Sequence, residues 1–289
     1  MKTQKYLIAR HLSFTLCLFL TCSLTNARLI AQDAEDPEPD SAPKIVRPSA
    51  SDSASLKLIQ NYLITSGGEE QHRQLRNIRV TGEYKEARDL KYFTLIETHK
   101  GKRYLRLNWK LRGVEHEQVY AYDGSEAWQQ KTMPDDKRRN LPTPYKGRAA
   151  VHFINQRWFI HPFNPPLFQD YVFQYSGADS IGNRPSHLVV GYGPKNERTW
   201  FYFDQETFLV TRWGGIGAVS SGEAYLDYQA KGFKSVDGIF LPTGLTMLAK
   251  DEAYGEIIFQ TVETNVEVSP NLFSKPVVEI PTLRTVPAK

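Results

Sequence analysis

The sequence predicts a mainly β protein of the α+β class, built on a large antiparallel sheet that meanders and curls. From residue 78 onward, apolar residues recur with a period of two in a long series of segments separated by turn residues. Helical periodicity is confined to residues 53–75 and to one interruption at residues 148–159. A series of strands without regularly alternating helices is typical of antiparallel sheets and not of βαβ units.

The first 31 residues have the three parts of a secretory signal peptide. A positively charged start precedes an apolar run at residues 12–24, and small residues follow that run. We expect cleavage after Ala27 or Ala31, and therefore an exported, periplasmic protein. The apolar run is shorter than the ~20 residues that cross a bilayer, and no second apolar span follows it. The mature chain is therefore expected to have no transmembrane segment.

An alternative for the N-terminus is a lipoprotein anchored through Cys22. The three residues before it are Phe19, Leu20 and Thr21, whereas a lipoprotein signal normally has a small residue directly before the cysteine. This sequence therefore favours cleavage without lipidation.

After the signal, acids and prolines alternate with almost no apolar side chains, as in DAEDPEPDSAP at residues 33–43. Such a segment buries too little surface to offset its ordering entropy, so residues 32–52 are predicted to be a disordered linker. A single β domain is expected over residues 53–280, followed by a tail at residues 281–289.

The charge of the chain is concentrated at its start. The formal net charge of +4 comes from 36 basic and 32 acidic residues, and four of the bases lie in residues 1–31. Both cysteines, Cys17 and Cys22, lie there too, so the mature chain has none and is close to neutral. A disulfide scaffold, a cysteine-ligated metal and a cysteine nucleophile are excluded for that chain, and nucleic acid is a poor candidate partner.

The mature chain is predicted to begin with two helices. Leu56, Ile59 and Leu63 follow a helical spacing, and Gly67-Gly68 ends the first helix. Glu69 and Glu70 favour the start of a second, short helix, because acids are stabilised at the positive end of a helix dipole.

Twelve strands are predicted after these helices, joined in part by hairpin turns at Asp123-Gly124, Gly182-Asn183 and Asp237-Gly238. Their ranges are 78–88, 91–99, 102–110, 115–122, 126–131, 171–176, 186–192, 198–204, 208–213, 222–231, 239–249 and 255–264.

An insertion interrupts the strand series. The segment RAAVHFINQRWF at residues 148–159 has helical spacing, and the proline-rich HPFNPPLF that follows forbids regular structure. We interpret the insertion as a lid over one end of the sheet or as a plug in its core, since both need the same apolar face. The lid residues would be Phe153, Trp158, Phe163 and Phe168.

Several strands are apolar on both faces, most clearly TWFYF at residues 199–203. Either helices cover the outer face there, or the inner face lines a cavity for an apolar ligand, or an ordinary core is combined with an aromatic outer face. Alternation nominates as cavity residues Leu105, Leu107, Trp109, Trp128, Phe201, Phe203 and Leu209.

Signals for catalysis or metal binding are weak. The six histidines of the mature chain form no HExxH or HxH motif, so no metal site is predicted. The glycine cluster at residues 214–217 is not followed by Lys-Ser or Lys-Thr, and we interpret it as a mobile turn. Strand acids such as Glu97 and Asp227 are expected to lie on a solvated face of the sheet. No catalytic residue is predicted.

The order of elements resembles the outer-membrane lipoprotein-sorting (LolA-like) superfamily, which includes periplasmic lipoprotein carriers and mycobacterial lipid carriers. The resemblance covers roughly residues 53–275. It is carried by YLITSGG from Tyr62, IRVTG from Ile78, YDGSEAW from Tyr122, WFYFDQETFLVTR from Trp200, VDGIFLP from Val236 and NVEVSPNLF from Asn265.

The resemblance implies an incomplete antiparallel β-barrel of about 10–12 strands around helices, with an apolar cavity for acyl chains, no cofactor and no covalent chemistry. Our first hypothesis is thus an exported, monomeric, non-enzymatic protein that binds an acyl lipid or lipoprotein, as a periplasmic carrier in lipoprotein or lipid sorting to the outer membrane. An inner- or outer-membrane envelope protein is a further candidate partner. The second is an envelope protein-interaction or stress-sensing module of the same fold. The third is a secreted hydrolase that uses strand carboxylates.

Overall fold

The computed structural model describes residues 47–277, except 87–88, 133–139, 166, 195–196 and 220–221. The described residues belong to one compact unit. The predicted signal peptide with its cleavage sites, residues 32–46 of the predicted linker and the tail at 281–289 lie outside them. The end of the predicted linker is described, and Asp52 there donates its backbone N–H to Phe173 O at 3.1 Å.

One antiparallel sheet of 13 strands dominates the fold, in the order β6-β5-β4-β3-β2-β1-β15-β14-β11-β10-β9-β8-β7. The strands are β1 (Asn77–Glu86), β2 (Asp89–Thr98), β3 (Arg103–Leu111), β4 (Val114–Tyr122), β5 (Ala127–Thr132), β6 (Thr143–Pro144), β7 (Val172–Ile181), β8 (Arg184–Tyr192), β9 (Arg198–Asp204), β10 (Val210–Val219), β11 (Gly222–Ala230), β14 (Gly244–Ala249) and β15 (Glu252–Thr264). Within the described residues the end strands β6 and β7 do not pair with each other, so the curled sheet stays open.

The predicted fold class is confirmed: the protein is mainly β, with an incomplete antiparallel barrel and few helices. The main sheet has 13 strands, whereas 10–12 were expected. The two-residue strand β6 is too short for a periodic pattern to reveal it. The predicted strand 239–249 is two strands that belong to different sheets, because the extended strand is interrupted at Thr243.

A separate hairpin forms from β12 (Phe233–Val236) and β13 (Ile239–Pro242). Its turn residues Asp237 and Gly238 have φ angles of 46° and 83°, which is the left-handed backbone that a two-residue hairpin requires. The predicted turn at this position is confirmed. Strand β12 itself was not predicted, because four residues carry too little alternation.

Three α-helices accompany the sheet: α1 (Ser53–Thr65), α2 (Glu69–Gln74) and α3 (Gly147–Asn155). Asp52 caps α1 by accepting the Ser55 N–H at 2.7 Å, and the first two helices lie where the sequence places them. Two short 3-10 turns follow later, at Leu167–Asp170 and Pro270–Leu272.

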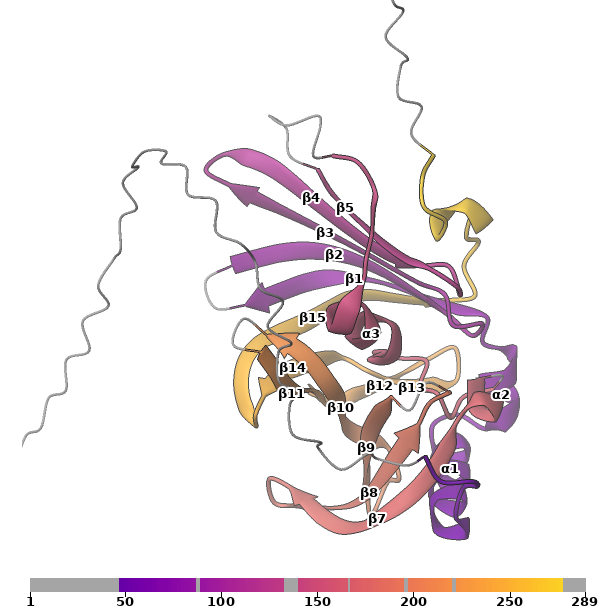
Figure 1. Cartoon of the computed structure of the whole chain (residues 1–289). Helices are drawn as coiled ribbons and strands as arrows, with labels where there is room; N and C mark the ends of the chain where they lie inside the picture. Colours follow the sequence, from indigo (N-terminus) through magenta and orange to yellow (C-terminus); the bar gives the residue numbers. More distant parts are fainter. Residues whose placement is uncertain are drawn as a thin grey trace, which may run out of the picture. The chain divides into compact units, whose positions relative to one another are not determined.

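The main core lies on the concave face of the sheet. In β3 the side chains of Leu105 and Leu107 are buried on this face and alternate with Arg106 and Asn108, as predicted. Figure 1 shows α3 within the curl of the sheet. The inserted residues thus occupy the space that an empty barrel would leave open.

The glycine cluster is not a turn. Gly214 and Gly215 lie inside β10. Because each lacks a Cβ, a side chain from another part of the chain packs directly against its backbone. A Cβ at Gly214 would overlap Asp227 Oδ1 on the outer face, and one at Gly215 would overlap Gln156 Nε2 on the concave face. The interpretation as a mobile turn is therefore wrong, because these glycines serve close packing on both faces of the sheet.

Gly214→Ala is expected to lower the free energy of unfolding by about 1–3 kcal/mol, since the added methyl group forces Asp227 out of its position. Urea unfolding followed by circular dichroism measures this. Gly232→Ala is the control, because its Cβ would meet only Thr243 Oγ1, at 3.2 Å. Equal stability of the two variants would contradict the packing role of Gly214.

Candidate functional site

The insertion, residues 147–171, crosses the concave side of the sheet and is held there by buried charges. Glu97 on β2 is fully buried. Its Oε1 accepts the backbone N–H of Trp158 at 2.9 Å, and its Oε2 accepts those of Phe159 at 3.0 Å and Ile160 at 3.1 Å. One carboxylate therefore satisfies three consecutive backbone donors of a segment that has no regular structure.

Arg103 on β3 holds the other end of the same segment. Its Nε lies 3.2 Å from Glu97 Oε1, an ion pair that lacks the alignment of a hydrogen bond. Its Nη1 donates to Phe153 O and, at 2.9 Å, to Gln156 O. These contacts end α3 at Asn155 instead of near residue 159 as predicted, because tertiary groups bond the backbone that would continue the helix.

Two strand acids thus contradict the expectation of a solvated sheet face. Glu97 is on the concave face, and Asp227 on β11 is 4% exposed although it lies on the outer face. Asp227 accepts from Trp200 Nε1 at 2.8 Å and from Arg212. Desolvation by burial raises the pKa of Asp227. Both acids are buried with partners, which offsets the cost of removing their charges from water.

Three of the four predicted lid residues, Phe153, Trp158 and Phe163, are buried in the core. The ring of Phe163 lies 4.9 Å from that of Phe201 and 5.7 Å from that of Phe203. Phe168 is half-buried. It stacks on Phe173 at a centroid distance of 5.5 Å.

The predicted cavity residues divide into three groups. Leu105, Leu107, Phe201 and Phe203 lie together in the main core, and the half-buried Trp109 packs against it. Trp128 is buried on the opposite face of the sheet with Val119 and Ala121, where its Nε1 donates to Phe273 O at 2.7 Å. Leu209 is half-buried in the turn between β9 and β10.

A groove of about 510 Å³ lies between α1, α2 and the insertion. We call it the apolar groove after six of its lining residues, namely Leu56, Ile59, Leu63, Phe163, Pro165 and Phe168. Polar and charged side chains line it as well, namely Gln60, Glu69, Arg73 and Gln169. Two predicted lid residues, Phe163 and Phe168, belong to it. Phe163 also contacts Phe201, so the inner wall of the groove is part of the aromatic core.

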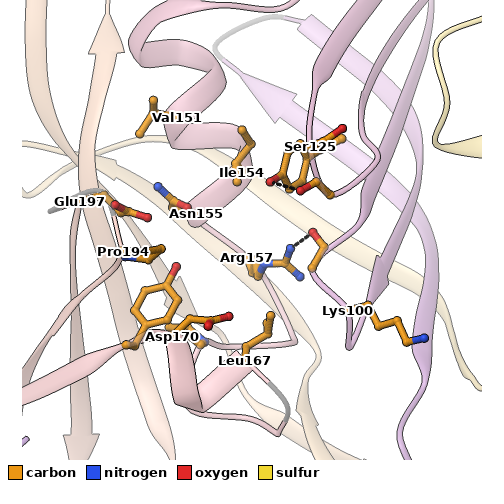
Figure 2. A pocket seen from close by; sticks show the side chains of 15 residues that line it. Lys100, Ser125, Val151, Ile154, Asn155, Arg157, Leu167, Asp170, Pro194 and Glu197 are labelled. Carbon is orange, nitrogen blue, oxygen red and sulfur yellow. Dashed lines mark hydrogen bonds between the residues drawn. The ribbon is translucent and has the colours of Figure 1, made fainter.

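A second hollow of about 350 Å³, with two basic and two acidic side chains in its lining, lies beside the insertion (Figure 2). We call it the Arg157 hollow. Its lining residues are Lys100, Gly101, Tyr122, Gly124, Ser125, Val151, Ile154, Asn155, Arg157, Pro162, Leu167, Asp170, Tyr171, Pro194 and Glu197. The neighbouring residues Leu167 and Phe168 line different hollows, so one turn of the insertion separates them.

Buried histidines pack around the insertion as neutral bases. His72 Nε2 hydrogen-bonds with Ser66 Oγ at 2.7 Å, and Asn164 Nδ2 donates to His72 Nδ1 at 2.8 Å. Burial lowers the pKa of His72 to about 4 and that of His161 to about 3. No group of three or more potential metal-ligating residues occurs in the part of the chain that the structure describes.

Sequence reasoning missed Glu97, Arg103 and Arg157 as elements of the site. A signal existed for the first two, because the period of two that points Leu95 and Leu105 inward also points Glu97 and Arg103 inward. Arg157 lies in irregular structure, where no period applies.

Comparisons with known proteins support the fold. No family model and no curated protein sequence matches this chain. A protein domain from Vibrio parahaemolyticus assigned to outer membrane lipoprotein sorting has a TM-score of 0.50 at 11% identity, covering 77% of this chain and 97% of that one. A LolA superfamily protein from Nitrosomonas europaea has a TM-score of 0.50 at 13% identity, covering 76% and 97%. A DUF1329 family protein from Desulfovibrio piger has a TM-score of 0.51 at 12% identity, covering 76% and 96%.

The protein therefore has the LolA-like fold, as the sequence motifs predict. At 11–13% identity the likeness shows the fold alone. None of the helices in the described ranges is long and apolar enough to cross a membrane.

Proposed function

We propose that this protein is an exported, non-enzymatic carrier that binds an acyl chain of a lipid or lipoprotein in the apolar groove. The LolA-like fold supports the proposal, since one of the similar structures is named as a lipoprotein-sorting protein domain and another as a LolA superfamily protein. The observation that carries it is the groove itself, which is lined by apolar side chains of α1 and by Phe163, whose ring packs on Phe201 of the aromatic core.

Burial of apolar surface is sufficient to hold such a ligand without catalytic groups. Each methylene that leaves water contributes about 0.8 kcal/mol, so eight buried methylenes contribute roughly 6 kcal/mol before the cost of association. Leu56 is 39% exposed and lines the groove. An apolar side chain left accessible in a hollow of this kind is a typical feature of a binding site.

Leu56→Glu is expected to weaken binding of a dansyl-labelled undecanoic acid at least about tenfold, because an apolar tail would have to desolvate the new carboxylate. The fluorescence of the dansyl group, titrated against protein, measures the affinity. Ile64→Glu is the matched control. It places the same charge on the same helix at a side chain that is 61% exposed and does not line the groove.

Unchanged affinity of Leu56→Glu, or equal loss in both variants, would contradict the proposed function. Native mass spectrometry of protein from a periplasmic extract gives a second measurement. Co-purified acyl lipid supports the carrier, whereas a lipid-free protein that captures a specific envelope protein favours the interaction module.

A further inference from the structure

The interior beside the insertion contains more positive than negative charge. Glu97, Arg103 and Arg157 are all at least 94% buried, so two guanidinium groups accompany one carboxylate. Both oxygens of Glu97 are already engaged by Arg103 and by three backbone N–H groups. The trio therefore carries an excess of one positive charge.

The excess charge resides on Arg157. Its guanidinium donates to two backbone carbonyls of the β2–β3 connection, Thr98 O at 3.3 Å and Gly101 O. These acceptors are neutral dipoles, so they hold the side chain in position without cancelling its charge. Burial lowers the pKa of Arg157, which reflects the cost of keeping this cation out of water. An anionic group in the hollow would offset that cost.

The Arg157 hollow also has a negative side. Lys100, on the same β2–β3 connection, adds a second cation, while Asp170 and Glu197 line the hollow as well. Figure 2 shows Arg157 and Lys100 toward one side, and Glu197 and Asp170 toward the other. A hollow with separated positive and negative sides is complementary to a ligand that carries both charges, and it disfavours a purely anionic one.

Apolar side chains also line the hollow. Val151 and Ile154 of α3 contribute to it together with Pro162 and Leu167, beside polar residues such as Asn155. Leu167 is followed directly by Phe168, which lines the apolar groove. A headgroup in the Arg157 hollow and an acyl chain in the groove would thus both contact the same 3-10 turn of the insertion.

We propose that the Arg157 hollow binds a zwitterionic phosphoethanolamine headgroup, with the phosphate at Arg157 and Lys100 and the ammonium group at Asp170 and Glu197. This inference rests on the proposed function, because it names the headgroup of the same acyl lipid. Arginine forms strong paired hydrogen bonds with phosphate oxygens. A primary ammonium group donates three hydrogen bonds to carboxylates, whereas the quaternary ammonium of choline donates none.

Isothermal titration calorimetry with soluble dihexanoyl lipids tests the proposal. Dihexanoyl phosphatidylethanolamine is expected to bind at least about tenfold more tightly than dihexanoyl phosphatidylglycerol or dihexanoyl phosphatidylcholine. Free phosphoethanolamine is expected to bind more weakly than the lipid. Equal affinity for free phosphoethanolamine and for dihexanoyl phosphatidylethanolamine would assign the hollow to a soluble phosphorylated amine and overturn the lipid assignment.

Exposed side chains of the hollow provide variants that leave the core intact. Asp170→Asn is expected to reduce the preference for phosphatidylethanolamine over phosphatidylglycerol by about three- to tenfold, and Lys100→Gln to weaken both lipids. Asp179→Asn and Lys131→Gln, exposed residues outside the hollow, are the matched controls. Thermal unfolding followed by circular dichroism confirms that each variant is folded.

Two results would overturn the inference: equal binding of the three lipids, and tighter binding of phosphatidylglycerol than of phosphatidylethanolamine. If either occurs while the dansyl-labelled acid still binds in the groove, the headgroup assignment is wrong and the proposed function stands. If free phosphoethanolamine binds and depends on Asp170 while the acyl probe does not bind, the hollow is confirmed and the acyl-binding function is wrong.

Discussion

Glu97→Gln is expected to lower the free energy of unfolding by about 3–5 kcal/mol, among the largest effects of any single substitution in this chain. The carboxylate of Glu97 accepts the N–H groups of Trp158, Phe159 and Ile160 and pairs with Arg103. Glutamine offers one acceptor oxygen where three donors converge, and it leaves the Arg103 charge buried without its partner.

Urea unfolding at pH 7, followed by tryptophan fluorescence, measures the effect. Glu263→Gln is the control, because Glu263 pairs with Arg79 at 2.8 Å on the surface of the sheet. Its replacement is expected to have little effect, since water screens an exposed pair. A Glu97→Gln variant as stable as the control would show that Glu97 does not hold the insertion in place.

The fold was predictable because its main determinant is local. Alternation identified most strands, and the residues of the Asp237-Gly238 turn identified a hairpin. The end of α3 was not predictable in the same way. Residues 156–159 continue the helical pattern, but Glu97 and Arg103, about 50 to 60 residues away in the sequence, bond their backbone instead. Contacts between residues that far apart in the sequence produce no periodic pattern from which they could be predicted.

The candidate site was predictable only in part, for a related reason. Hydrophobicity identifies buried side chains but not the face on which they are buried. Trp128 was assigned to the cavity with Leu105, yet the chain near Phe273 covers it on the outer face. The charge of Glu97 was also misleading, because a charged strand residue is expected on the solvated face, whereas Glu97 is buried on the concave face. Its inward position follows from the register of β2, and its burial requires partners that only the fold brings together.

Acidification from pH 7 to pH 4.5 is expected to destabilise the protein through three histidines that pack against the insertion or belong to it, the buried His72 and His161 and the half-buried His152. Burial lowers the pKa of His72 and of His152 to about 4 and that of His161 to about 3. Arg103 adds to the effect at His152. His161 is enclosed by rings, with Trp213 at 4.9 Å and Phe163 at 5.1 Å, and besides its burial the charges of His72 and Arg157 oppose its protonation.

The direction follows from the two pKa values of each histidine. In the unfolded chain a histidine protonates near pH 6.5, whereas in the folded protein it stays neutral until about pH 4 or below. The unfolded state therefore binds more protons between these values, and stability falls as the pH drops through that interval. Down to pH 4.5, two units below the pKa of the unfolded chain, each histidine contributes roughly 3 kcal/mol at most. Carboxylates with a lowered pKa, such as that of Asp204, act only nearer pH 4 and below, so the two effects occur in different ranges.

Urea unfolding at half-unit steps from pH 7.5 to 4.5 measures the loss, which is expected to reach at least about 3 kcal/mol. In His161→Phe the difference between pH 7.5 and pH 4.5 is expected to shrink by about a third, because one of three titrating groups is gone. The measurement at pH 7.5 isolates the packing cost of the substitution, since His161 is neutral there in both states. A stability that does not change between pH 7 and pH 5 would mean that the insertion opens readily enough for water to reach these rings. That result would make the insertion a mobile lid and not a fixed plug.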